Sequence, residues 1–215
     1  MTALTDEPDP KARMLSAGAL AGAGLPTRVW AGQGPSLETH RLVLRPLRAQ
    51  DAEPVSRFIS DWDVARQGLS IAHPYTQARA VEWIGEAQAE WAQGRVYAFA
   101  LARRSDARFL GVLSLRLLEP RLRGRADIGY WLGQPFWGRG YALEAIEAVK
   151  PFAHRRLRLR LLDASVYNEN LRSLRVLEKA GFRRVGTAGL TVRDGARRRS
   201  ISLYRHSLGS QGAAR

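Results

Sequence analysis

The segment from Asp127 to Phe152 constrains the fold more than any other part of the chain. A short apolar run leads into the turn Gly138-Arg139-Gly140, and beyond it the apolar residues follow helical spacing: Ala142, Ala145, Ile146, Val149 and Phe152. That spacing predicts a helix with one buried face. Glycines at a helix start allow a ligand close to the backbone, and the first helical turn has unpaired N–H groups at the positive end of the dipole. Strand, glycine turn and helix in this order favour a site for an anion such as a pyrophosphate.

The glycine pair by itself also fits an ordinary tight turn. It matches neither the Gly-x-x-x-x-Gly-Lys-Ser/Thr phosphate loop nor the Gly-x-Gly-x-x-Gly dinucleotide fingerprint. A second segment adds information, because Asn170 and Ser173 lie one helical turn apart and precede the run Glu178-Lys-Ala-Gly-Phe182. An Asn in front of a helix is also typical of an N-cap, so this position has two interpretations.

Together these motifs resemble the GNAT acetyltransferases. Trp137-Gly-Arg-Gly-Tyr-Ala142 is similar to the family's cofactor turn, and the Asn170 to Phe182 segment follows it in the family's order. Leu37-Glu-Thr-His-Arg-Leu-Val-Leu-Arg-Pro-Leu47, and Pro74-Tyr-Thr76 followed by Trp83-Ile84, resemble the RimJ/RimL-type branch, the ribosomal-protein N-acetyltransferases. The resemblance runs from Leu37 to His206.

Two positions depart from the family pattern. Pro135 stands three residues before the first glycine, where the family often has Gln or Arg, and Gln134 lies one position earlier. His40 replaces the Glu of the usual Thr-Glu-Arg-Leu motif. Backbone contacts to a pyrophosphate need no particular side chain, so the resemblance still implies them.

The resemblance implies a site for acetyl-CoA. The turn N–H groups should face the pyrophosphate, with Arg139 adding charge, and the end of the preceding strand should run beside the pantetheine arm and supply oxyanion donors. For Tyr130 and Trp131, core packing is the alternative. The expected cofactor-binding residues are Tyr130, Trp131, Leu132, Gly138, Arg139, Gly140, Tyr141, Ala142 and Asn170.

Asp127 and Ser173 are the expected catalytic residues. Asp127 stands where relatives often carry Glu, and a carboxylate beside a partly dry cleft can accept a proton from the amine, directly or through water. A solvated carboxylate paired with Arg125 is the alternative. Ser173 matches a serine that can donate to the departing sulfur. Tyr167 is a weaker acid candidate, and the acidic residues Glu144 and Glu169 are interpreted as solvated charges.

Composition excludes several other classes of site. The chain has 215 residues and no cysteine, which excludes disulfides, thiolate metal sites and a cysteine nucleophile. Its four histidines lack metal-ligand spacing, so no metal is expected. The formal net charge of +14 favours polyanions such as RNA or the ribosome, although solvated arginines on an ordinary surface are the alternative.

Periodicity predicts one α/β domain at 37–208, with a flexible Ala/Gly-rich extension at 1–36 and a disordered tail at 209–215. No apolar run reaches the roughly 20 residues that span a bilayer, and the acidic start does not resemble a secretory signal, so a cytoplasmic protein is expected. Helices are expected after Asp51 and Thr76, after Gly140, and over 171–180. Strands are expected at 37–45, 96–102, 109–117, 125–132, 157–166, 182–187 and 199–206.

This element order predicts a mixed, mostly antiparallel sheet with helices on both faces. The family resemblance further implies that the sheet is splayed near its middle and holds the cofactor in the split.

Three functions remain open. The first is acetyl-CoA-dependent acetylation of a protein N-terminal amine, by direct attack in a ternary complex. The second is acetylation of a small amine, such as an amino acid, polyamine or aminoglycoside, although a basic chain disfavours polycations. The third is a non-catalytic module that binds CoA or RNA. The acceptor, and whether the chain is a monomer or a homodimer, are not specified by these residues.

Overall fold

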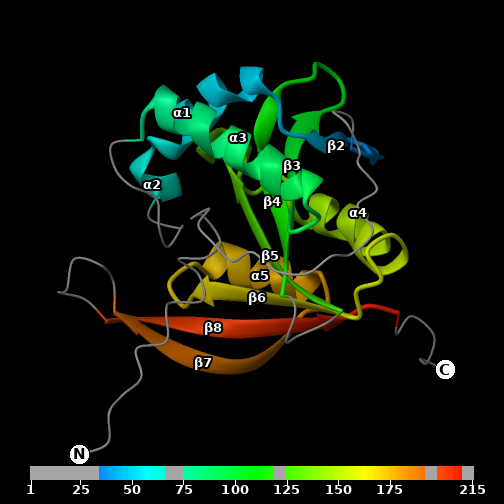
Figure 1. The fold of residues 1–215 in the computed structure, drawn as a ribbon. Helices are drawn as coiled ribbons and strands as arrows, with labels where there is room; N and C mark the ends of the chain where they lie inside the picture. Colours follow the sequence, from blue (N-terminus) through cyan, green and yellow to red (C-terminus); the bar gives the residue numbers. More distant parts are fainter. Residues whose placement is uncertain (1–33, 66–74, 119–123, 192–197, 210–215) are drawn as a thin grey trace, which may run out of the picture.

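The computed structural model describes residues 34–65, 75–118, 124–191 and 198–209 (Figure 1). The expected extension, 1–36, lies outside these ranges except for Gly34, Pro35 and Ser36, and the expected tail lies outside them except for Gly209. No helix in the described ranges combines the length and apolar character needed to cross a membrane.

The described strands form one eight-stranded sheet (Figure 1). They lie in the spatial order β1-β2-β3-β4-β5-β6-β8-β7, and all neighbours are antiparallel except β5 and β6. The predicted mixed, mostly antiparallel sheet is therefore confirmed. The strands are β1 (Leu37–Glu38), β2 (Leu42–Pro46), β3 (Val96–Arg103), β4 (Phe109–Leu117), β5 (Arg125–Leu132), β6 (Leu161–Tyr167), β7 (Arg183–Thr191) and β8 (Arg198–Ser207).

Helices cover both faces of this sheet, as predicted. Arg116 of β4 pairs with Glu90 of α3 on one face, whereas Phe99 of β3 points to the other face and packs on Phe152 of α4. The first three helices lie on the Arg116 face, and α4 and α5 lie on the Phe99 face (Figure 1). The α-helices are α1 (Ala52–Ile59), α2 (Trp62–Ala65), α3 (Gln77–Ala92), α4 (Tyr141–Arg155) and α5 (Leu171–Lys179).

The helix expected after the glycine turn is confirmed as α4. The residues that form its buried face are the ones with helical spacing in the sequence: Ala142, Ala145, Ile146, Val149 and Phe152. The start of α3 is also confirmed, because the Thr76 side chain accepts a hydrogen bond from the Arg79 N–H at 3.1 Å.

The strand expected at 37–45 is instead two short strands, β1 and β2, joined by a turn. The Thr39 hydroxyl accepts from the Leu42 N–H at 2.8 Å, and the chain reverses so that Leu37 pairs with Leu44. The alternation of apolar and basic residues was compatible with one strand, since the turn depends on a side-chain contact that periodicity does not describe.

Two further expectations were wrong in detail. The strand expected from Leu157 begins at Leu161, because the Leu157 N–H still bonds to the Phe152 carbonyl of α4 and Arg158 has φ +57°. Asp51 precedes α1 as expected but does not cap it with its side chain. Its carboxylate accepts instead from Arg45 and from the Arg48 N–H, each at 2.8 Å.

Candidate active site

The sheet splits between β5 and β6. The two strands pair only where Arg125, Ala126 and Asp127 face Leu161, Leu162 and Asp163. Past Asp127, β5 stays paired with β4, while β6 stays paired with β8. A cavity of about 570 Å³ has walls from both diverging halves, including Ile128–Leu132 of β5 and Ala164–Val166 of β6. The edge of β5 that faces β6 is therefore open to the cavity.

The glycine turn forms one wall of this cavity. Gly138 and Gly140 have φ +73° and +79°, a conformation that only glycine adopts without strain. Gly140 is the N-cap of α4, and the first helical hydrogen bond runs from Glu144 N to Gly140 O at 3.1 Å. The N–H groups of Tyr141, Ala142 and Leu143 thus precede the helical ladder and stand at the positive end of the α4 dipole.

Tyr130 and Ser173 meet beside this wall. Their hydroxyl oxygens lie 2.8 Å apart, and burial raises the pKa of Tyr130 well above its ordinary value, so the phenol stays protonated. Asn170 Oδ1 accepts from the Ser173 N–H at 3.1 Å, which is the N-cap interpretation of this residue. All three residues line the cavity, so Asn170 both caps α5 and faces the cavity.

Basic residues line the α5 side of the cavity, and one more, Arg116 of β4, lines it on the α3 side. Arg172, Arg175 and Lys179 all come from α5. The Arg172 guanidinium lies 4.8 Å from the centre of the Trp137 ring, and Trp137 Nε1 donates to the Leu132 carbonyl at 2.8 Å. The α5 side of the cavity is therefore positively charged, and through Arg172 it contacts Trp137, the residue before the glycine turn.

The acidic side chains that line the cavity, Glu86 and Glu90, come from α3 on the opposite face of the sheet. Glu90 pairs with Arg116 at 3.5 Å, and one oxygen of Glu86 accepts from Arg79 at 3.3 Å. The other oxygen, Glu86 Oε2, is buried and has no hydrogen-bond partner among the described residues. Sequence reasoning missed both acids. Their spacing relative to Trp83, one and two turns along α3, was the available signal.

Comparison with known proteins identifies the family. The model of the acetyltransferase (GNAT) domain matches residues 41–183, about two thirds of the chain. The chain belongs to the GNAT family.

Several related proteins align with this chain over most of their length. An uncharacterised N-acetyltransferase of Bacillus licheniformis is 30% identical over 177 residues, covering 80% of this chain and 95% of that protein. The [ribosomal protein uS5]-alanine N-acetyltransferase of Escherichia coli is 25% identical, covering 71% of this chain and 80% of its own. RimJ of Mycobacterium smegmatis, solved with CoA-disulfide, superposes with a TM-score of 0.70 at 24% identity, covering 83% and 88% of the two chains. The resemblance to the RimJ/RimL-like branch is confirmed, and the chain is an N-acetyltransferase of the GNAT type.

Most residues expected to form the GNAT site line the cavity: Tyr130, Trp131, Leu132, Gly138, Gly140, Tyr141, Ala142, Asn170 and Ser173. Arg139 is not among the lining residues. It is exposed, and its carbonyl accepts from Arg41 at 2.9 Å.

Asp127 is also absent from the cavity lining. It lies at the closed end of the split, next to the lining residue Ile128, and faces Arg116 of β4 and Asp163 of β6 across the pairs. By strand alternation its side chain is on the α3 face, whereas Tyr130 is on the α5 face. The role of Asp127 therefore remains a prediction.

The interpretation of Glu144 as a solvated charge was wrong. Its carboxylate accepts from the Thr39 hydroxyl at 2.6 Å and from Arg41 N and Nε at 2.8 and 2.7 Å. Burial acts to raise the pKa of Glu144, but these hydrogen bonds and the Arg41 charge lower it below the ordinary value. Glu169 is exposed as expected. Tyr167 is buried under the Arg199 guanidinium and does not line the cavity.

Proposed function

We propose that this protein transfers the acetyl group of acetyl-CoA to a primary amine, the N-terminal amine of a protein. The observation that carries the proposal is the cavity in the split sheet, with a helix N-terminus and basic α5 residues on one face and acidic α3 residues on the other. An anionic thioester cofactor suits the first side, and an ammonium acceptor suits the second.

The cofactor side fits the phosphates and arm of acetyl-CoA. Gly138 and Gly140 line the cavity without a β-carbon, and a β-carbon built on Gly138 meets no described atom within 4 Å. The N–H groups of Tyr141 to Leu143 would bind the pyrophosphate, and the open β5 edge at Tyr130–Leu132 would hold the pantetheine arm. N–H groups on that edge would stabilise the oxyanion, because they are already oriented before the reaction.

The chemistry requires two proton movements. The acceptor enters as an ammonium and gives up a proton, for which Asp127 acting through water is the proposed base. The free amine attacks the thioester carbon and the C–S bond breaks. The second proton that the attacking nitrogen loses passes through the Ser173 hydroxyl to the departing thiolate, so Ser173 ends the reaction with a proton of its own. The 2.8 Å contact between the Tyr130 and Ser173 hydroxyl groups holds Ser173 in place.

The protein N-terminus as acceptor is supported by the branch to which the chain is similar. The Escherichia coli relative bears the name of an enzyme that acetylates the alanine of a ribosomal protein. A small polyamine or aminoglycoside is the second candidate. The lining acids Glu86 and Glu90 favour it although the whole chain is basic, and Arg116, which pairs with Glu90, offsets part of their charge. Net charge therefore does not disfavour polycationic acceptors.

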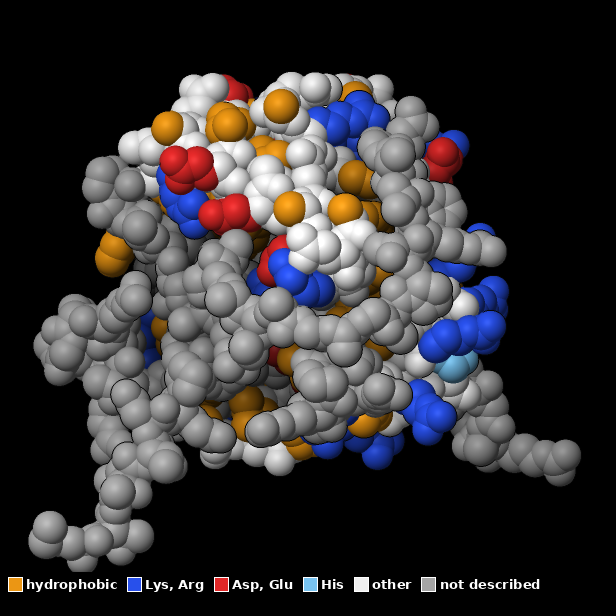
Figure 2. Space-filling view, in the orientation of Figure 1, with side chains coloured by type: hydrophobic (Ala, Val, Ile, Leu, Met, Phe, Trp, Pro, Cys, Tyr) orange, Lys and Arg blue, Asp and Glu red, His pale blue; other side chains and the backbone are white. Residues whose placement is uncertain are grey.

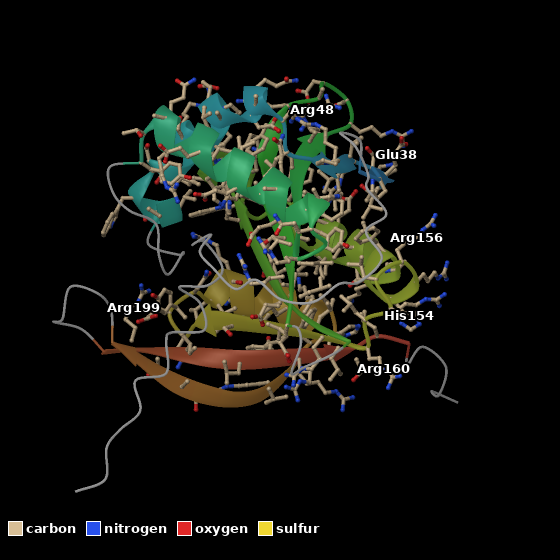
Figure 3. All side chains as sticks on the ribbon, in the orientation of Figure 1. Glu38, Arg48, His154, Arg156, Arg160 and Arg199 are labelled. Atoms are coloured by element: carbon tan, nitrogen blue, oxygen red, sulfur yellow. The ribbon has the colours of Figure 1, made fainter. Side chains whose placement is uncertain are left out.

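RNA or ribosome contact is a further part of this proposal. Figure 2 shows Lys and Arg side chains along one margin of the molecule, and Figure 3 shows His154, Arg156 and Arg160 pointing outward there, near the end of α4. The cofactor turn lies at the other end of this 15-residue helix, about 20 Å away. A polyanion bound there would leave the active site free.

The test is release of free thiol from acetyl-CoA in the presence of an acceptor panel. Peptides with ribosomal-protein N-termini should give turnover, and their N-acetylated forms should give none. Mass spectrometry should locate the acetyl group on the α-amine. Turnover only with polyamines or aminoglycosides would support the second candidate. CoA binding without turnover on any acceptor would support a non-catalytic module.

Gly140→Val provides a variant with a blocked cofactor site. A β-carbon there lies 3.3 Å from the Arg41 guanidinium in a backbone conformation that valine avoids, so the turn must move. Calorimetry should show acetyl-CoA affinity reduced at least about tenfold, equivalent to ~1.4 kcal/mol. Unchanged affinity in a folded variant would place the pyrophosphate elsewhere.

A further inference from the structure

Arg41 reaches the cofactor turn from a distant part of the chain. It lies between β1 and β2, and its Nη1 donates to the carbonyl of Arg139, the residue between the two left-handed glycines, at 2.9 Å. Its guanidinium also lies 4.6 Å from the centre of the Tyr141 ring. Arg41 thus contacts both the turn and the first residue of α4.

The Arg41 side chain is held in this position by Glu144. The carboxylate of Glu144 accepts from Arg41 N and Nε and from the Thr39 hydroxyl, at distances between 2.6 and 2.8 Å. Only 17% of the Glu144 side chain is exposed, compared with 41% for Arg41. Since three donors converge on a largely buried carboxylate, the orientation of the guanidinium is fixed before any ligand arrives.

The hydrogen bond from Arg41 to the Arg139 carbonyl also determines where the Gly140 N–H points. The C=O of Arg139 and the N–H of Gly140 belong to the same planar trans unit, so they point in opposite directions. Rotation of this unit changes ψ of Arg139 and φ of Gly140, and the wide φ range open to a glycine makes the rotation inexpensive. A hydrogen bond from Arg41 to the carbonyl removes that freedom and directs the Gly140 N–H away from Arg41.

We propose that Arg41 is a positioning residue for the cofactor. It holds the 139–140 peptide so that the Gly140 N–H, together with the first N–H groups of α4, faces the pyrophosphate. This inference rests on the proposed function only in taking the turn as the pyrophosphate site. Arg41 acts through the turn, because it does not line the main cavity and lies instead beside a small basic recess with His40, Arg103 and Arg104.

The test compares CoA with pantetheine, which lacks the pyrophosphate and the nucleotide. Arg41→Met should lower CoA affinity about 10-fold in calorimetry, the usual range for a lost hydrogen bond to a charged group. Pantetheine binding, followed by NMR titration, should stay within about 2-fold. Arg41→Lys should fall between wild type and Arg41→Met. A general loosening of the site would instead weaken both ligands.

Arg104→Met is the matched control. Arg104 lies beside the same recess and donates to the Thr39 carbonyl at 3.3 Å, but the structure gives it no contact with the glycine turn. Its replacement removes the same charge and should leave CoA affinity within about 2-fold. An equal loss in Arg41→Met and Arg104→Met would show a long-range charge effect and overturn the proposal.

A double variant separates positioning from misfolding. Arg41→Met leaves Glu144 without its main partner, so Arg41→Met/Glu144→Met removes both charges while keeping side-chain volume. The double variant should lose CoA affinity as the single variant does, since the bond to Arg139 O is still absent. Restored affinity would overturn the proposal. Wild-type CoA binding without acetylation of any amine would refute the proposed function alone, whereas absence of CoA binding by the wild type would refute both.

Discussion

At the scale of single residues, the proton acceptor is the main assignment to test. Asp127 lies at the closed end of the split, on the α3 face with Glu90 and one residue before the cavity lining. If it takes the proton through water, Asp127→Asn should lower turnover by about 10²–10⁴-fold and leave CoA affinity unchanged. The loss should shrink at high pH, where free amine is abundant. The pH–rate profile with one competent peptide measures this.

Ser173→Ala provides the comparison for Asp127. It should slow thiol departure, and its loss of turnover should not shrink at high pH, because it removes the proton donor to sulfur and leaves the proposed base in place. If Asp127→Asn keeps wild-type turnover at pH 7, Asp127 is not the base, and ordered water removes the proton instead.

At the scale of elements, Thr39, Arg41 and Glu144 join the β1–β2 turn to α4. The pKa of Glu144 is lowered in the folded protein. The junction therefore makes its full contribution to the free energy of unfolding above the ordinary glutamate pKa of 4.5, and this contribution is lost as the pH falls below that value. Glu144→Gln should reduce the free energy of unfolding by about 1–3 kcal/mol at pH 7 and by less at pH 4. Urea unfolding at both pH values measures the difference.

Glu147→Gln serves as the control on the same helix. Glu147 is half-exposed and pairs with Lys150 at 2.7 Å, so its replacement should change stability by no more than about 0.5 kcal/mol. A Glu144→Gln effect that does not depend on pH would show that packing, and not the carboxylate charge, holds the junction.

At the scale of the whole molecule, the two halves of the sheet meet at a narrow junction. Asp163 of β6 accepts from Nε of Arg125 in β5 at 2.9 Å and from Nε of Arg205 in β8 at 2.7 Å. This ion group crosses the strands where β5 and β6 still pair. Asp163→Asn should lower the free energy of unfolding by about 1–3 kcal/mol, measured by chemical denaturation, because two arginines lose a largely buried carboxylate.

Asp106→Asn tests whether any ion pair would give the same loss. Asp106 pairs with Arg103 in the turn between β3 and β4, where 44% of its side chain is exposed, so its replacement should leave the denaturation midpoint almost unchanged. Equal losses in the two variants would show that the position of Asp163 at the junction has no special importance.

The sequence by itself determined the features that depend on near neighbours. The apolar spacing after Gly140 determined α4, alternation and turn residues located β3, β4 and β5 closely, and the glycine pair with Asn170 and Ser173 indicated the family and most of the cavity lining. These predictions succeeded because the residues that specify a helix, strand or turn lie within a few positions of one another in the sequence.

Only the tertiary structure decided which distant charges meet. Glu144 was interpreted as solvated, yet its partner Arg41 lies 103 residues away. Glu86 and Glu90 line the cavity because α3 packs against β3 on that face of the sheet. On a helix, an acid that faces solvent and one that faces a cavity have the same local sequence pattern. Their roles follow from strand order and from the loss of pairing between β5 and β6, which bring residues together through space and not along the chain.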